Sequence, residues 1–192
     1  MLKEKLLDPA SGVLLYGTTP PRTGTAEDAV RAAADKLAAR LASLPLDGVV
    51  VYDIQDESGR TAVPRPFAFT GTIDPRAYAR LLAERTGRPS IAYKSLGAMD
   101  EPAWQAWLDE SARDFGVGFL SVVGRPTSGV KYPLALAKAI RLAAAHPSGF
   151  AVGGVAIAER HTAERSEAAP ARQIDRGLRL LHLANGVFGA GH

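Results

Sequence analysis

The sequence predicts an α/β protein built on a parallel sheet, because short apolar segments alternate with amphipathic helical segments along most of the chain. The apolar segments recur roughly every 30 to 40 residues, as expected of βα units. They lack the alternation of polar and apolar side chains that marks a half-exposed strand, so both faces of the sheet should be covered. Two closures fit, a doubly wound open sheet and a (β/α)8 barrel of the TIM type.

The composition indicates an ordinary globular domain. The 192 residues are 46% hydrophobic and 22% charged, and the net charge of +3 is too small and scattered to predict nucleic-acid binding. Cysteine is absent and the four histidines lack metal-ligand spacing, so no disulfide and no metal site is expected. We see neither a signal peptide nor an apolar run of spanning length, which predicts a cytoplasmic protein without membrane contact.

The first two βα units occupy the N-terminal half of the chain. Residues 12–17 predict a strand, and Thr25 with Asp28 predicts the N-terminus of a helix. A second strand, 47–54, is rich in β-branched residues, and Asp74-Pro75 opens a second helix that ends at Gly87. The apolar face of the first helix is expected at Val30, Ala34, Leu37, Leu41 and Leu44.

Three more strands follow, separated by two helices. The third helix begins near Asp100, and its Trp104 and Trp107 are expected in the core because they recur at helical spacing. The remaining predicted elements are the strands 89–96, 118–124 and 149–158 and the helix 132–146.

In either closure the functional site lies where the strands end. The segment "YDIQDESGR" after the second strand places Asp53, Gln55, Asp56 and Glu57 there. Carboxylates in such a position can shuttle protons or, with the glutamine, orient polar groups of a ligand. The alternative is a solvated loop whose side chains make turns.

Other strand ends carry further candidates. Tyr93 and Lys94 end the third strand, and the ammonium of Lys94 either pairs with the acidic loop or meets an anionic or carbonyl group of a ligand. Arg125 follows the fourth strand, and Glu159 and His161 follow the fifth. His161 is either a ligand contact or an ordinary hydrogen-bonded loop residue.

The turn after the first strand is stiff. Pro20 and Pro21 cannot donate ladder hydrogen bonds, so they end the strand and keep the chain extended. This turn should present Arg22 at the mouth of the sheet, where it either serves the site or pairs with the acidic loop.

Five segments at these strand ends resemble, in order, the methylenetetrahydrofolate reductase family, whose members are (β/α)8 barrels. "LLYGTTPPRT" is similar to the family's first strand and its PPRT or PPKT turn. The others are "VVVYDIQDESGR", "RTGRPSIAYKSLG", "FLSVVGRPTSG" and "VGGVAIAERHT". The resemblance implies an incomplete TIM-type barrel over residues 1–162, with about five βα units, followed by an atypical tail over 163–192.

The chain departs from the family at flavin-facing positions. The family's catalytic glutamate is Gly17 here, its flavin-facing aspartate is replaced by Arg125, and its third-strand histidine is Tyr93. Glu159 and His161 are kept. The resemblance is thus to a divergent branch of the kind found in actinobacteria, in which FAD binding is doubtful.

The resemblance implies NAD(P)H-dependent reduction of 5,10-methylenetetrahydrofolate to 5-methyltetrahydrofolate, in one-carbon and methionine metabolism. In the family FAD carries the hydride. With Gly17 in place of the glutamate, Asp53, Asp56 and Glu57 become the candidate proton donors, and Arg22 and Lys94 could hold the folate tail or a nicotinamide phosphate. The alternative is a folate- or flavin-binding barrel without turnover.

The tail no longer resembles the family. Residues 178–188 read "LRLLHLANGVF", and codons can be chosen for them from the genetic code. When the same bases are translated in the reading frame one base later, they give "CDSFISQTVY", which resembles the family's sixth strand. This predicts a frameshift near Glu167; the alternative is a genuine amphipathic tail. Five βα units would also leave the first and fifth strands as open edges, so self-association through those edges is expected.

Overall fold

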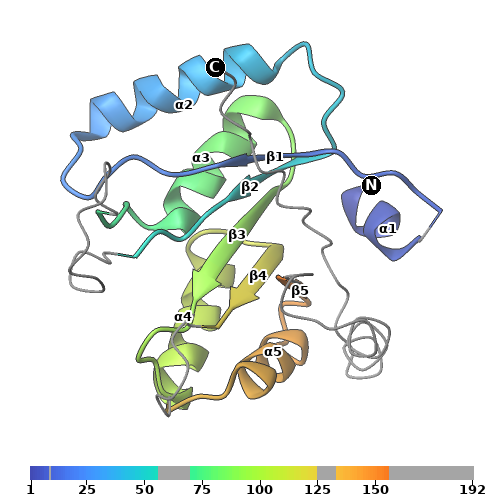
Figure 1. The fold of residues 1–192 in the computed structure, drawn as a ribbon, viewed down its shortest axis with the longest axis vertical. Helices are drawn as coiled ribbons and strands as arrows, with labels where there is room; N and C mark the ends of the chain where they lie inside the picture. The colour runs from blue at the N-terminus through green and yellow to red at the C-terminus, as the bar shows by residue number, and fades with distance from the viewer. Residues whose placement is uncertain (9, 56–69, 125–132, 156–192) are drawn as a thin grey trace, which may run out of the picture.

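The computed structural model describes residues 1–8, 10–55, 70–124 and 133–155, and these residues form five helices and five strands (Figure 1). Every strand and helix predicted above is present, although most are shorter than the sequence pattern suggests. In chain order the elements are α1 (Leu2–Leu7), β1 (Leu15–Thr18), α2 (Glu27–Leu41), β2 (Gly48–Val51), α3 (Pro75–Thr86), β3 (Ser90–Ser95), α4 (Glu101–Arg113), β4 (Phe119–Val123), α5 (Leu136–Ala144) and β5 (Ala151–Gly154).

The strands form one parallel sheet in the order β1-β2-β3-β4-β5. Each strand lies beside its neighbour in the sequence, and the order never reverses within the described sheet. A doubly wound sheet reverses its strand order at a switch point, where ligands bind. The sequential order therefore matches the winding of a (β/α)8 barrel.

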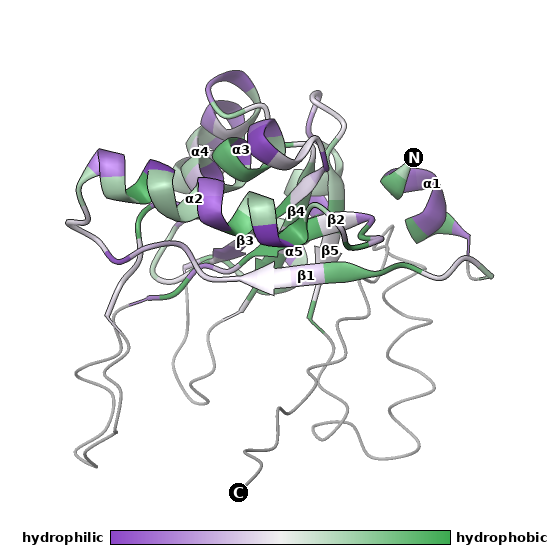
Figure 2. Cartoon of the chain, turned by 90° about the horizontal axis from the view of Figure 1, so that it is seen from above, coloured by the Kyte–Doolittle hydropathy of each residue, from purple (hydrophilic) through white to green (hydrophobic). Residues whose placement is uncertain are grey.

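The helices confirm this winding because α2, α3, α4 and α5 all pack on the same face of the sheet. Their buried side chains contact the alternate strand residues Val49, Val51, Leu120 and Val122 in one apolar cluster. Figure 2 shows α2, α3 and α4 on one side of the strands. We call this helix-covered side the outer face and the opposite side the inner face. The fold is a parallel α/β fold of the TIM-barrel type with five βα units.

The short helix α1 was not predicted from the sequence. Its Leu2 is buried against the inner face, in a second cluster with Val50 and Ile91. The Lys5 ammonium lies 2.6 Å from Asp47, next to the start of β2, and this hydrogen bond helps to hold the pKa of Asp47 below its usual value. A six-residue helix is not stable alone, so packing rather than local propensity explains α1.

The start of α2 also differs from the prediction. Its N-terminal cap is Ala26, which makes no side-chain capping bond, and the Thr25 hydroxyl instead donates to the Arg22 carbonyl at 2.7 Å. Thr25 therefore closes the turn after β1 rather than capping the helix. The helix ends at Leu41, so Leu44 lies beyond it and is exposed.

The caps of α3 and α4 are as predicted. Asp74 accepts a hydrogen bond from the Arg76 amide at 2.8 Å, and Asp100 accepts one from the Ala103 amide at 2.9 Å. Gly87 ends α3 with a φ of 65°, a left-handed conformation that glycine adopts without strain.

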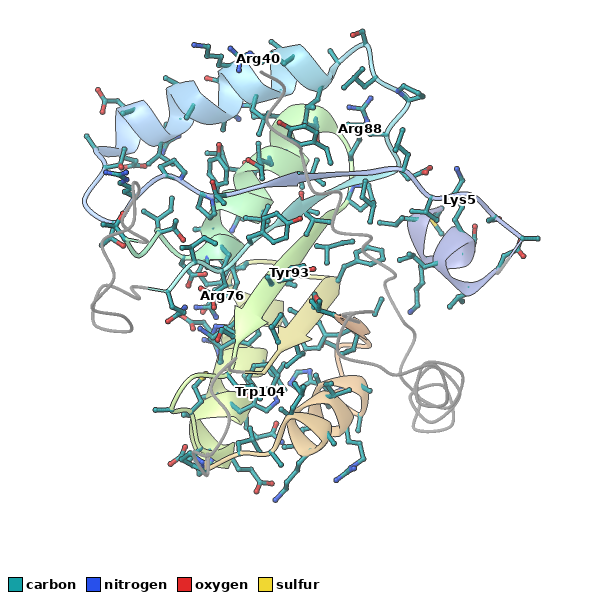
Figure 3. All side chains as sticks on the ribbon, viewed as in Figure 1. Lys5, Arg40, Arg76, Arg88, Tyr93 and Trp104 are labelled. Atoms are coloured by element: carbon teal, nitrogen blue, oxygen red, sulfur yellow. The ribbon has the colours of Figure 1, made fainter. Side chains whose placement is uncertain are left out.

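The core of the outer face is built around Trp104, as the helical spacing predicted. Trp104 is completely buried, its ring stacks on Trp107 at 5.1 Å, and its indole N–H donates to the Ala139 carbonyl at 3.0 Å. This hydrogen bond joins α4 to α5. Figure 3 shows Trp104 in this layer. None of the helices within the described ranges has the length and apolar character needed to cross a bilayer.

Candidate functional site

The inner face carries a row of residues that runs across the sheet from the end of β2 to β5. Tyr93 of β3 pairs in register with Ser121 of β4, which pairs with Gly153 of β5. Tyr52, just after β2, lies beside Tyr93, with the two ring centroids 5.0 Å apart and the planes at 75°. We call Tyr52, Tyr93, Ser121 and Gly153 the inner row. Tyr52 follows the carboxyl end of β2, which is where barrel enzymes place their chemistry, and the other three residues lie within their strands.

Tyr93 is a neutral member of the inner row. The residue is 8% exposed and belongs to the inner cluster with Val50 and Ile91, and burial raises the pKa of its phenol to about 12. Figure 3 shows Tyr93 on β3, at the centre of the sheet. The predicted site residue thus lies within β3, on the inner face of the sheet. A binding role for it remains a proposal.

Tyr52 fills the space beside Gly17 on β1. A Cβ atom on Gly17 would lie 2.5 Å from the Tyr52 hydroxyl oxygen and 2.9 Å from its Cε2 atom. The phenol therefore occupies the position that a side chain at residue 17 would need. A glutamate there does not fit while Tyr52 keeps this position, so the described residues do not fit a flavin site of the family's pattern.

Asp53, Gln55 and Lys94 are brought together at the ends of β2 and β3. The two carboxylate oxygens of Asp53 accept hydrogen bonds from the Ser95 amide at 2.9 Å and from the Gln55 side chain at 2.7 Å. The Lys94 ammonium lies 3.6 Å from the same carboxylate, whose side chain is 7% exposed. Of the two alternatives for Lys94, the structure shows the pairing with the acidic segment.

This cluster lies toward the helices rather than among the inner row. The Lys94 ammonium is 5.7 Å from the centre of the Trp107 ring, and Trp107 belongs to the outer cluster. Because donors occupy both oxygens of Asp53, its visible role is to tie the end of β2 to β3. Its predicted role as a proton donor would require these bonds to break.

Arg22 sits in a turn that is fixed on a second segment of the chain. It forms an antiparallel bridge with Thr72, and the Pro21 carbonyl accepts a hydrogen bond from the Ile73 amide at 3.0 Å. The Thr23 amide donates to the Gly71 carbonyl, also at 3.0 Å. The loop after β1 is thus held against the residues that lead into α3, and Arg22 is exposed there.

Several predicted site residues lie outside the described residues. They are Asp56, Glu57, Arg125, Glu159 and His161. Within the part of the chain that the structure describes, no three histidine, aspartate or glutamate side chains gather closely enough to hold a metal ion.

The outer surface has a groove of about 460 Å³ between α2 and α3. Two of its charged residues, Arg31 and Arg80, pair with Glu27 and Glu84 of their own helices. The groove lies in the helix layer, away from the inner row. We therefore place the candidate site on the inner face.

Tyr52 and Ser121 were missed at the level of sequence. Tyr52 ends the apolar run "GVVVY", where it reads as one more strand residue, and Ser121 is a small polar residue inside "FLSVV". The available signal was the glycine at position 17, which leaves β1 without a side chain beside the neighbouring strand β2. Only the position of the Tyr52 side chain shows that it occupies the space beside Gly17.

No protein-family model matches the chain, and no curated protein matches its sequence. Among solved structures, the chain is similar to an uncharacterized protein from Clostridium thermocellum that binds two copies of 5-methyl-5,6,7,8-tetrahydrofolic acid. The two are 27% identical with a TM-score of 0.74, and the match covers 96% of this chain and 58% of that one.

A second similar structure is 2,3-dimethylmalate lyase, a member of the PEP mutase/isocitrate lyase superfamily. The identity is 14% and the TM-score 0.59, over 94% of this chain and 60% of that one, which shows a shared fold alone. The chain thus spans about three fifths of each of these proteins. The comparisons support a TIM-barrel-type fold and similarity to a protein that binds a reduced folate.

Proposed function

We propose that this barrel binds a reduced folate related to 5-methyltetrahydrofolate at the carboxyl ends of its strands. The observation that carries the proposal is the similarity to the folate-binding protein, at 27% identity over 96% of this chain. Barrels of this type bind their ligands at that end of the sheet. Tyr52 lies there, beside the rest of the inner row, which supports this placement.

The chemistry of the inner row suits such a ligand. A reduced folate has a fused ring with polar edges and a tail that ends in carboxylates. Tyr52 is only partly buried and packs edge-to-face on the buried Tyr93, so its ring edge and hydroxyl group can contact the ring of the ligand. The exposed guanidinium of Arg22 can bind a carboxylate of the tail through paired hydrogen bonds.

Reductase activity is a more specific proposal than folate binding, and it rests on the family resemblance. It would transfer a hydride from NAD(P)H to 5,10-methylenetetrahydrofolate, and this chain's own groups would have to hold the folate and supply a proton. The space at Gly17 is taken by a phenol, so the carboxylate of the family is replaced. Binding without turnover is the function that the similarity to the folate-binding protein favours.

Isothermal titration of the full chain with 5-methyltetrahydrofolate tests binding. We expect saturable binding, with a stoichiometry of one or two ligands per chain. Tetrahydropterin without the tail and p-aminobenzoylglutamate without the ring should each bind more weakly than the whole molecule. Absence of any heat signal from folded protein would overturn the proposal.

A separate assay decides between binding and turnover. NADH absorbance is followed with 5,10-methylenetetrahydrofolate, with and without added FAD. Folate binding without NADH oxidation supports a binding barrel. Oxidation that depends on the folate would establish a reductase, and dependence on FAD would show that flavin is used despite Gly17.

A further inference from the structure

Gly17 is not required by the backbone at its own position. The glycines with a positive φ in the described residues are Gly24, Gly87, Gly97, Gly116 and Gly149, and Gly17 is not among them. An ordinary residue could adopt its strand conformation. What excludes a side chain there is Tyr52, whose hydroxyl and ring atoms lie within 3.0 Å of the place where a Cβ would be.

Tyr52 is held in this place from two sides. Its ring packs edge-to-face on Tyr93 at 5.0 Å, and Tyr93 is itself buried. Its amide donates to the Thr18 carbonyl at 3.0 Å, which fixes the backbone against the end of β1. The phenol is therefore positioned before any ligand binds.

We infer that Tyr52 is a ligand-contacting residue that sets the specificity of this site. Gly17 makes this possible because it has no side chain in the space that the Tyr52 phenol occupies. The inference rests on the proposed function, and it names the group that contacts the polar edge of the folate ring. A phenol both donates and accepts a hydrogen bond, whereas a carboxylate only accepts. A phenol therefore suits a ring edge that presents N–H and carbonyl groups side by side.

Three single variants test the role of Tyr52. Tyr52→Phe removes the hydroxyl and keeps the ring, and Gly17→Ala pushes the phenol away. Tyr16→Phe is the matched control, because Tyr16 is next to Gly17 on β1 but points to the other side of the strand, with 38% of its surface exposed. Thermal unfolding of each variant confirms that it is folded.

Affinity for 5-methyltetrahydrofolate is then measured by titration. Tyr52→Phe and Gly17→Ala should each weaken binding about five- to ten-fold, as expected for one hydrogen bond, and Tyr16→Phe should leave it unchanged. Tyr52→Phe and Gly17→Ala both act through the Tyr52 hydroxyl. The variant that combines them should therefore bind the folate no more weakly than whichever single variant has the lower affinity. Additive losses would contradict the shared mechanism.

The outcomes separate this inference from the proposed function. If the unaltered chain binds the folate and Tyr52→Phe binds equally well, the inference is wrong and the proposed function stands. If the unaltered folded chain does not bind, both fail as statements about folate. Near-ultraviolet circular dichroism tests the geometry without ligand: Gly17→Ala should change the tyrosine signal, and should not do so when Tyr52 is already alanine.

Discussion

The two faces of this sheet differ in how completely the described residues fill them. The outer face buries Trp104 completely and encloses even a charged side chain, Arg76, between helices. The inner face carries Gly17 and Gly153 beside two tyrosines and a serine. We therefore propose that residues that alternate along one strand serve different purposes, with stability on the outer face and recognition on the inner face.

Arg76 shows how far the outer face is specialised for stability. The residue is 5% exposed, and its guanidinium donates to Asp74 and Glu110 and lies 4.7 Å and 4.4 Å from the ring centres of Trp107 and Phe115. Figure 3 shows Arg76 near the start of α3. This difference between the two faces predicts that substitutions on the outer face cause large losses of stability. Substitutions on the inner face should weaken ligand binding with little loss of stability.

The largest effect is expected at Trp104. Trp104→Ala removes a fully buried ring and its hydrogen bond to Ala139, so the free energy of unfolding should fall by about 3–5 kcal/mol. Chemical denaturation followed by circular dichroism measures this. The exposed Tyr16→Ala is the control, with an expected change of roughly 0.5 kcal/mol or less. A loss at Trp104 no larger than at Tyr16 would contradict the proposed division of the two faces.

The next effect is expected at Arg76. Arg76→Met keeps the length of the side chain but leaves Asp74 and Glu110 unpaired, and these are 37% and 44% exposed. Since water can partly solvate both carboxylates, we expect a loss of about 2–3 kcal/mol, below the usual cost of breaking a buried pair. Arg80→Met, one turn away, removes an exposed pair with Glu84 and an exposed hydrogen bond to the Asp114 carbonyl, and should cost about 1 kcal/mol or less. Similar losses in both variants would refute a special role for Arg76.

Two glycines of neighbouring strands give an intermediate effect. At Gly48 a Cβ would lie 2.8 Å from the Pro89 carbonyl, which belongs to the backbone and cannot move away. Gly48→Ala should therefore cost about 1–3 kcal/mol. At Gly17 the obstacle is the tip of Tyr52, which can rotate, so Gly17→Ala should cost less than about 1 kcal/mol while weakening ligand binding. Thermal unfolding compares them, and a greater loss at Gly17 would contradict this reasoning.

The sequence predicted the fold well because its signals are local. Apolar runs, the caps at Asp74 and Asp100, and the spacing of Trp104 and Trp107 each describe one element, and the structure confirms them. These local signals did not decide between an open sheet and a barrel. The resemblance of five segments to a barrel family predicted the barrel, and the sequential strand order and the packing of four helices on one face confirm it.

The candidate site was predicted only in part, for the same reason. Pairing of Lys94 with the acidic segment was one of two alternatives, and the structure shows Lys94 beside Asp53. The exclusion between Gly17 and Tyr52 depends on two strands far apart in the sequence. The tail 163–192 lies outside the described residues, so the frameshift near Glu167 stays a prediction, to be checked by sequencing the gene.

The smallest effect at neutral pH is expected from Tyr93→Phe, which removes one hydroxyl from the inner row and should change stability by less than about 1 kcal/mol. The difference should grow in alkali. Burial raises the pKa of the Tyr93 phenol to about 12, above the value of 10.0 for a free tyrosine. The folded protein thus favours the neutral phenol, and this contribution is complete below pH 10 and lost as the pH rises toward 12.

Over that range the original chain should lose roughly 2 kcal/mol more than the Tyr93→Phe variant. Urea denaturation at a series of pH values measures this difference, while ultraviolet absorbance follows tyrosine ionisation. Burial also raises the pKa of Tyr78 on the outer face, but that residue is present in both proteins and cancels in the comparison. Parallel stability curves across the alkaline range would show that the Tyr93 phenol is as accessible to solvent as a free tyrosine, and that the inner row is more open than its burial indicates.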